Sequence, residues 1–151
     1  MIRNDIRNIA IIAHVDHGKT TLVDAMLKQS GVFRANERVE ERVMDSNDLE
    51  RERGITILAK NTSVRYGDTK INIIDTPGYF DFVGEVEEAV SAAGAAIIVV
   101  NGKSGIEVGT QKAWELCEKY KLPRFIYVSN MDVDNASCRQ VVEDMTNLYG
   151  K

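Results

Sequence analysis

The stretch "AHVDHGKT" at residues 13–20 has residue types and spacing that suit phosphate binding. A small residue is followed by four free positions and then Gly-Lys-Thr, between an apolar run and a helical pattern. Backbone N–H groups of such a loop, with the start of the next helix, stabilise phosphate oxygens. Lys19 would reach the β- and γ-phosphates, and the Thr20 hydroxyl would ligate Mg²⁺. A lysine that merely starts a helix is the alternative, and the strand-loop-helix context favours the phosphate loop.

Every residue of this loop is a candidate nucleotide contact. Ala13 replaces the glycine that often opens the pattern, which is acceptable where no positive φ is needed. His14 and His17, with Asp16 between them, could contribute to a metal site, but no further converging ligands are visible in the sequence. We favour loop imidazoles with backbone or solvent contacts. The candidate contacts are Ala13, His14, Val15, Asp16, His17, Gly18, Lys19, Thr20 and Thr21.

Two further motifs could detect a γ-phosphate. Asp75 ends the apolar run "INIID" and would sit beside Mg²⁺, through a coordinated water. The N–H of Gly78, in "DTPG", could approach the γ-phosphate because glycine has no side chain. Thr56, in "RGITI", could place its hydroxyl on Mg²⁺. An ordinary β-turn and an ordinary strand threonine are the alternatives, and the phosphate loop favours the sensors. The predicted metal ligands are Thr20, Thr56 and Asp75.

These motifs need strands to carry them to one edge of a sheet. Apolar runs alternate with helical patterns, which predicts an α/β fold with a mostly parallel sheet and helices on both faces. A turn at Gly67-Asp68 predicts one antiparallel hairpin strand at the sheet edge. The charged segment 32–55 is either a solvated loop or a switch segment that contacts a partner. The expected strands are 8–14, 56–66, 69–75, 95–101 and 124–129, and the expected helices are 19–31, 80–93, about 110–120 and 134–149.

Composition limits the function classes. At 151 residues and a net charge of −4, the chain fits one globular domain and gives no overall charge argument for a nucleic-acid partner, so no direct DNA binding is expected. The short apolar run near the N-terminus predicts neither a signal peptide nor a membrane span, which favours the cytoplasm. Cys117 and Cys138 have no metal-binding spacing and receive no role.

The motifs "AHVDHGKTT", "ERERGITI" and "DTPG", in this order and spacing, resemble the GTPase domain of the translational GTPases. Residues 1–78 are most similar to the ribosome-associated TypA/BipA type, and residues 79–151 to elongation factor G and its paralogues, so a natural domain and a chimera both fit. The resemblance implies a P-loop NTPase fold, GTP and GDP with Mg²⁺ as ligands, and the ribosome as partner of the full-length parent. It also implies a closing Ser-Ala segment that does not occur before Lys151, so we expect residues 1–151 to form a C-terminally incomplete GTP-binding domain.

Three positions depart from the pattern of that family. Where the family has Asn-Lys-x-Asp, this sequence has "SNMD", so Ser129 and Asn130 replace Asn and Lys, while Asp132 keeps the carboxylate that reads guanine. Tyr79 stands where most members have the histidine that orients the attacking water. A phenol can donate a hydrogen bond but cannot hold positive charge as an imidazolium does.

The sequence therefore predicts a GTPase in which Lys19 and Tyr79 are the catalytic candidates and hydrolysis is slow. A nucleotide sensor impaired in hydrolysis is the first alternative. A P-loop ATPase or small-molecule kinase is the second, and the "RGITI" and "DTPG" pair argues against it.

Overall fold

The computed structural model describes residues 3–31, 44, 49, 52 and 55–150. In chain order the elements are β1 (Ile6–Ala13), α1 (Lys19–Gln29), β2 (Lys60–Tyr66), β3 (Thr69–Asp75), the 3₁₀ turn η1 (Phe80–Phe82), α3 (Val83–Ala92), β4 (Ala95–Asn101), α4 (Val108–Lys119), β5 (Arg124–Ser129) and α5 (Cys138–Tyr149). The predicted charged segment 32–55 lies almost wholly outside the described residues.

The described residues form one sheet of five strands, in the order β2-β3-β1-β4-β5. β1 pairs in parallel with β3 and β4, and β4 pairs in parallel with β5. β2 is antiparallel to β3 and lies at the edge, joined to it by a turn in which Gly67 has a φ of +55°. The predicted α/β class, parallel sheet and antiparallel edge strand are confirmed.

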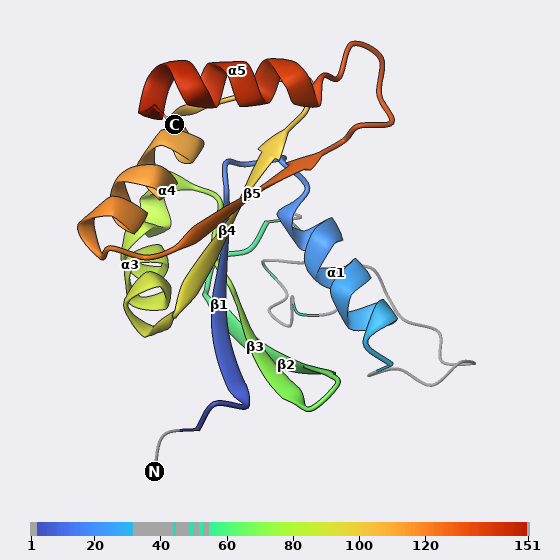
Figure 1. The fold of residues 1–151 in the computed structure, drawn as a ribbon, viewed down its shortest axis with the longest axis vertical. Helices are drawn as coiled ribbons and strands as arrows, with labels where there is room; N and C mark the ends of the chain where they lie inside the picture. Colours follow the sequence, from blue (N-terminus) through green and yellow to red (C-terminus); the bar gives the residue numbers. More distant parts are fainter. Residues whose placement is uncertain (1–2, 32–43, 45–48, 50–51, 53–54, 151) are drawn as a thin grey trace.

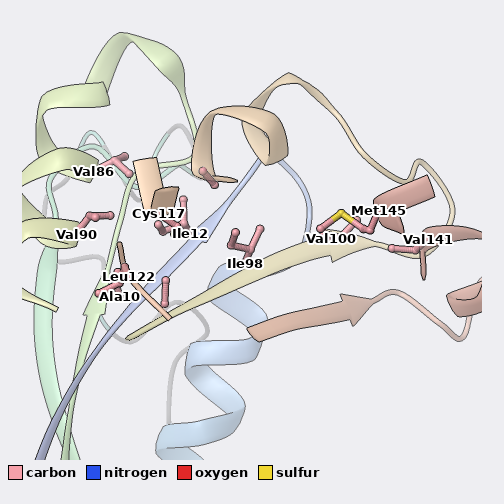
Figure 2. Packing of buried hydrophobic residues seen from close by; sticks show 12 residues of the cluster. Ala10, Ile12, Val86, Val90, Ile98, Val100, Cys117, Leu122, Val141 and Met145 are labelled. Carbon is pink, nitrogen blue, oxygen red and sulfur yellow. The ribbon is translucent and has the colours of Figure 1, made fainter. Parts of the chain in front are cut away.

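Alternating side chains of the strands form two hydrophobic clusters, one on each face of the sheet. On one face, β1 and β4 pack against α3, α4 and α5, and Figure 2 shows Val141 and Met145 of α5 beside Val100 of β4. On the other face, Ile11 of β1 packs with Val23 and Leu27 of α1. Figure 1 shows α1 on the opposite side of the strands from α3 and α4, which confirms helices on both faces.

Two predicted element starts differ from the structure by four residues. The hairpin strand begins at Lys60 instead of Thr56, because Lys60 already lies opposite Asp75, the last residue of β3. The last helix begins at Cys138 instead of residue 134, because Asn135 has a left-handed φ of 66°. Ser137 then caps the helix by accepting the N–H of Gln140 at 3.2 Å.

Candidate functional site

The carboxyl ends of β1 and β3 open onto a cleft of about 300 Å³. Such an edge is where open parallel sheets bind ligands. The cleft collects most of the residues singled out in the sequence, and they come from four separate segments of the chain. Its lining includes His14, Val15, Asp16, His17, Gly18, Lys19, Thr20, Thr21, Thr56, Gly78, Tyr79 and Asn130.

The loop from β1 to α1 turns its backbone sharply. Asp16 has a φ of 61° and Gly18 a φ of 80°, both in the left-handed region, while Ala13 ends β1 without a positive φ. Alternating left- and right-handed residues turn successive N–H groups toward one concavity, which suits an anion. α1 begins directly after Gly18, so its positive end faces the same cleft. The alanine at position 13 is therefore compatible with the loop geometry.

Lys19 and Asp75 form a buried ion pair between the first residue of α1 and the last residue of β3. The Lys19 side chain is 7% exposed and the Asp75 side chain is fully buried. A buried charge is costly unless it is paired, so each side chain holds the other in place. Asp75 does not itself line the cleft, but its partner Lys19 does.

Thr56 and Gly78 approach the loop from two other segments. Thr56 is buried and lies four residues before β2. A Cβ atom added at Gly78 would be 3.4 Å from the Ala13 oxygen and from the nitrogen and Cα of Val15, so this glycine packs directly on the phosphate-loop backbone. Tyr79, next to it, lines the cleft and is 39% exposed. A phenol at this place is accessible to a ligand in the cleft.

His17 is almost fully buried, so its contacts are with the backbone and with side chains and not with solvent. Its Nε2 lies 2.6 Å from Glu107 Oε2, and its Nδ1 lies near the backbone of Val99 and Asn101. Among the described residues, no group of three or more His, Cys, Asp or Glu side chains is placed to hold a metal ion. The backbone contacts expected for the loop imidazoles are present.

The residues expected to contact a base lie at or just after the end of β5, and they differ in burial and in whether they line the cleft. Ser129 is buried and donates its hydroxyl to the His17 carbonyl oxygen at 2.6 Å. Asn130 lines the cleft and has a positive φ of 51°. Asp132 is exposed and lies in the loop that follows, outside the cleft lining. Ser129 thus supports the loop through its hydrogen bond to His17, whereas Asp132 is exposed to solvent.

The family of elongation factor Tu GTP binding domains matches residues 4–151. The chain belongs to this family. Its relatives include the large ribosomal subunit assembly factor BipA of Bacillus subtilis, 53% identical over 98% of this chain and 24% of the relative. A putative elongation factor TypA-like SVR3, chloroplastic, of Arabidopsis thaliana is 49% identical over 97% of this chain and 22% of the relative.

A crystal structure of a protein from Thermus thermophilus has the same fold as this GTP-binding domain. Its TM-score is 0.87 at 33% identity, over 96% of this chain and 22% of that one. The chain therefore spans about a quarter of the length of the relatives given above. Within the described residues, none of the helices of this GTP-binding domain is long and apolar enough to cross a membrane.

Sequence reasoning missed a second layer beneath the phosphate loop of this GTP-binding domain. Glu107 contacts His17, Ser104 Oγ donates to Glu107 at 3.0 Å, and Gly109 donates its N–H to His14 Nδ1 at 3.2 Å. These residues lie about 90 positions after the loop, so no local spacing links them to it. The only sequence signal is their place directly after the strand β4, at the ligand-binding edge.

Proposed function

We propose that this chain is a GTP-binding, Mg²⁺-dependent switch domain of a cytoplasmic, ribosome-associated translational GTPase. The carrying observation is that Lys19, Thr20, Thr56 and Gly78 line one cleft although they come from three segments of the chain. This is the set of groups that binding a nucleoside triphosphate requires. The name of the Bacillus subtilis relative, a large ribosomal subunit assembly factor, supports the ribosome as partner of the longer protein.

The donor set fits Mg²⁺. Thr20 and Thr56 offer hydroxyl oxygens and Asp75 offers a carboxylate at the same edge, and Mg²⁺ prefers oxygen ligands. In this proposal Thr20 and Thr56 hold the ion directly, and Asp75 holds it through water. The bound ion would neutralise charge that develops on the phosphates. Lys19 would exchange its ion pair with Asp75 for the β- and γ-phosphate oxygens.

Hydrolysis would be in-line attack of water on the γ-phosphorus, with cleavage of the bond to the bridging oxygen and release of GDP and phosphate. Tyr79 is the side chain beside Gly78 that can orient this water, through its phenol oxygen. The phenol supplies no positive charge to the transition state, so turnover by the chain alone should be slow. The backbone N–H groups and Lys19 still stabilise the developing charge.

Guanine would be read by Asp132, whose carboxylate accepts the ring N–H and the amino group together, a donor pair that adenine lacks. Competition against a fluorescent guanine nucleotide tests this. GTP and GDP should displace it at concentrations at least about a hundredfold lower than ATP, given that unmet polar groups discriminate strongly. Displacement by ATP at the same concentrations would contradict guanine specificity and favour an ATPase or kinase.

The exposed phenol of Tyr79 also favours a second function, a nucleotide sensor that changes shape without useful hydrolysis. Single-turnover release of phosphate from GTP, with and without ribosomes, separates the two. The comparison needs a Tyr79→His variant and a Tyr66→His control, because Tyr66 is an exposed tyrosine on β2. If ribosomes stimulate phosphate release by the unmodified chain to at least the rate of Tyr79→His, the sensor function is contradicted. Release that remains at background in the unmodified chain and rises only in Tyr79→His removes the enzyme.

A further inference from the structure

The first turn of α4 faces the phosphate loop with a single carboxylate. Glu107, which precedes Val108, points one carboxylate oxygen at each imidazole of the loop. Oε2 lies 2.6 Å from His17 Nε2, and Oε1 lies 3.6 Å from His14 Nε2. The two rings are in edge contact, with centroids 5.3 Å apart. One side chain from a distant segment therefore contacts two residues of the loop that line the cleft.

Hydrogen-bond partners on the other side of each ring determine which nitrogen carries the proton. The backbone N–H of Gly109 donates to His14 Nδ1 at 3.2 Å, which makes that nitrogen an acceptor and places the proton on Nε2. His17 Nδ1 faces both the N–H of Asn101 at 3.2 Å and the carbonyl oxygen of Val99 at 3.3 Å, so the contact of its other nitrogen decides where a proton must lie. A lone pair on His17 Nε2 would repel a carboxylate at 2.6 Å, so this nitrogen also carries a proton. Both imidazoles therefore present N–H groups to Glu107.

The carboxylate is itself held in place. Ser104 Oγ donates to Oε2 at 3.0 Å, and the Glu107 N–H donates to Thr110 Oγ1 at 3.4 Å. The pKa of Glu107 is lowered, and the hydrogen bond from His17 is the largest cause. Contact with the loop thus stabilises the charged form of the carboxylate.

Gly109 contributes a second and independent contact. A Cβ atom placed there would lie 2.7 Å from the Cα of His14 and 2.7 Å from its Nδ1. Only the absence of a side chain lets the first turn of α4 approach the backbone of the loop this closely. The backbone N–H of Gly109 uses this approach to reach His14.

We propose that Glu107 is a positioning residue that, together with the close approach at Gly109, fixes the phosphate loop in its nucleotide-binding conformation. The inference rests on the proposed function, because it assigns Glu107 a part in binding the guanine nucleotide. Glu107 does not line the cleft and contacts no phosphate itself; it acts through His14 and His17. It should therefore matter for the phosphates of the ligand and not for the base.

The first test needs no nucleotide. In ¹⁵N NMR spectra of the chain, His17 should be the Nε2–H tautomer, with a ring proton protected from exchange with water. Glu107→Gln should accelerate that exchange at least about tenfold, because a charged hydrogen bond is replaced by a weaker neutral one. Glu115→Gln is the matched control, since Glu115 lies on the same helix and its side chain is 65% exposed. Exchange that is equally fast in the unmodified chain and in Glu107→Gln overturns the inference.

The second test measures binding of GDP and GMP to the same variants. Glu107→Gln should raise the Kd for GDP about tenfold, the effect of losing one charged hydrogen bond at about 1.4 kcal/mol. The Kd for GMP should change less, because GMP uses fewer contacts of the loop. Gly109→Ala should have the same effect with the carboxylate intact, and Glu115→Gln should have none. A purely structural loss would instead weaken GDP and GMP by one factor, and that result overturns the inference.

The two tests separate this inference from the proposed function. If the unmodified chain binds neither GTP nor GDP, the proposed function fails and the Glu107 inference fails with it, whatever the ring proton shows. If the unmodified chain binds GDP and both Glu107→Gln and Gly109→Ala bind it equally well, the proposed function stands and only the role of Glu107 falls. Thermal unfolding of each variant shows whether it is folded, and should either variant unfold, the other decides.

Discussion

Three segments distant in the sequence brace the phosphate loop, whereas the position expected to read the base lies in one loop after β5. The loop receives Asp75 from the end of β3, Glu107 from the start of α4 and Ser129 from the end of β5. Asp132 lies between Met131 and Val133, which are 46% and 41% exposed, and is itself exposed. Within the described residues, the proposed phosphate site is therefore preorganised and the proposed base site is much less so.

Because the two regions differ in this way, substitutions in the phosphate loop and in the loop after β5 should have different effects on nucleotide binding. Preorganised groups contribute affinity because little ordering remains to be done on binding. A base-reading carboxylate on an exposed loop contributes mainly to the choice between bases. Variants on the phosphate side should therefore weaken nucleoside diphosphates whatever their base, and variants on the base side should change which base is preferred.

The largest effect should come from Lys19→Ala. It removes the cation for the phosphates and one partner of a buried ion pair, which costs about 3–5 kcal/mol of unfolding free energy in such sites. We expect GDP binding to weaken by at least about a hundredfold, as for loss of a main phosphate contact. Lys28→Ala, on an exposed residue of the same helix, is the control. Lys19→Arg keeps the charge and should remain folded. Unchanged GDP affinity in Lys19→Ala would contradict the assignment of Lys19 to the phosphates.

Asp132→Asn should give the next largest effect, and one of another kind. The amide replaces one acceptor by a donor, so it loses a hydrogen bond to guanine and gains one to xanthine, whose 2-position carries an oxygen. GDP should bind about tenfold or more weakly and xanthosine diphosphate correspondingly more tightly. The measurement is competition of both nucleotides against a fluorescent analogue.

Asp134→Asn is the control for that variant, because Asp134 is an exposed acid in the same loop. If Asp132→Asn and Asp134→Asn keep the same preference for GDP, Asp132 does not read the base. If Asp132→Asn weakens GDP and xanthosine diphosphate alike, the loop supports the phosphates as well, and the contrast between the two sides fails.

Ser129→Ala should have a smaller effect. It tests whether Ser129 supports the phosphate site or the base site. Its hydroxyl donates to the His17 oxygen at 2.6 Å, and a typical net hydrogen bond contributes about 1 kcal/mol. We expect a loss of about that size in urea unfolding and GDP binding about threefold to fivefold weaker. Ser91→Ala is the matched control, because it removes a hydrogen bond of 2.7 Å to the Glu88 carbonyl oxygen at an exposed position of α3. Equal losses in the two variants would mean that Ser129 contributes nothing specific to the loop.

The sequence predicted the elements whose signals are local. The run 95–101 is β4 and the run 124–129 is β5 to the residue, because a continuous apolar stretch bounded by turns has few other solutions. Local signals failed at Thr56 and at residue 134, where strand register and the left-handed Asn135 decide the element starts. The roles assigned to Thr20, Asp75 and Asp132 remain predictions.

The bracing of the phosphate loop was beyond the sequence for a different reason. Glu107 and His17 are 90 positions apart in the sequence, and no sequence motif links one to the other. A glutamate before a helix has an ordinary use as a cap, so its second use becomes visible only when β4 brings it beneath the loop. Local patterns therefore predict the chemistry of the cleft, and the tertiary fold is needed to find what supports it.

The smallest effect concerns the pH dependence of that support. Contact with His17 lowers the pKa of Glu107 below its ordinary 4.5, so the folded state favours the carboxylate. For an acid with a lowered pKa, the added stability is present above the ordinary pKa and is lost as the pH falls through the lower, folded value. The difference in unfolding free energy between the chain and Glu107→Gln should therefore shrink as the pH falls below about 4.5. Urea unfolding at several pH values measures it, with Glu115→Gln as the baseline. A difference that instead grows as the pH falls below about 4.5 would show that the folded state disfavours the carboxylate, and the contact between Glu107 and the loop would then reduce stability.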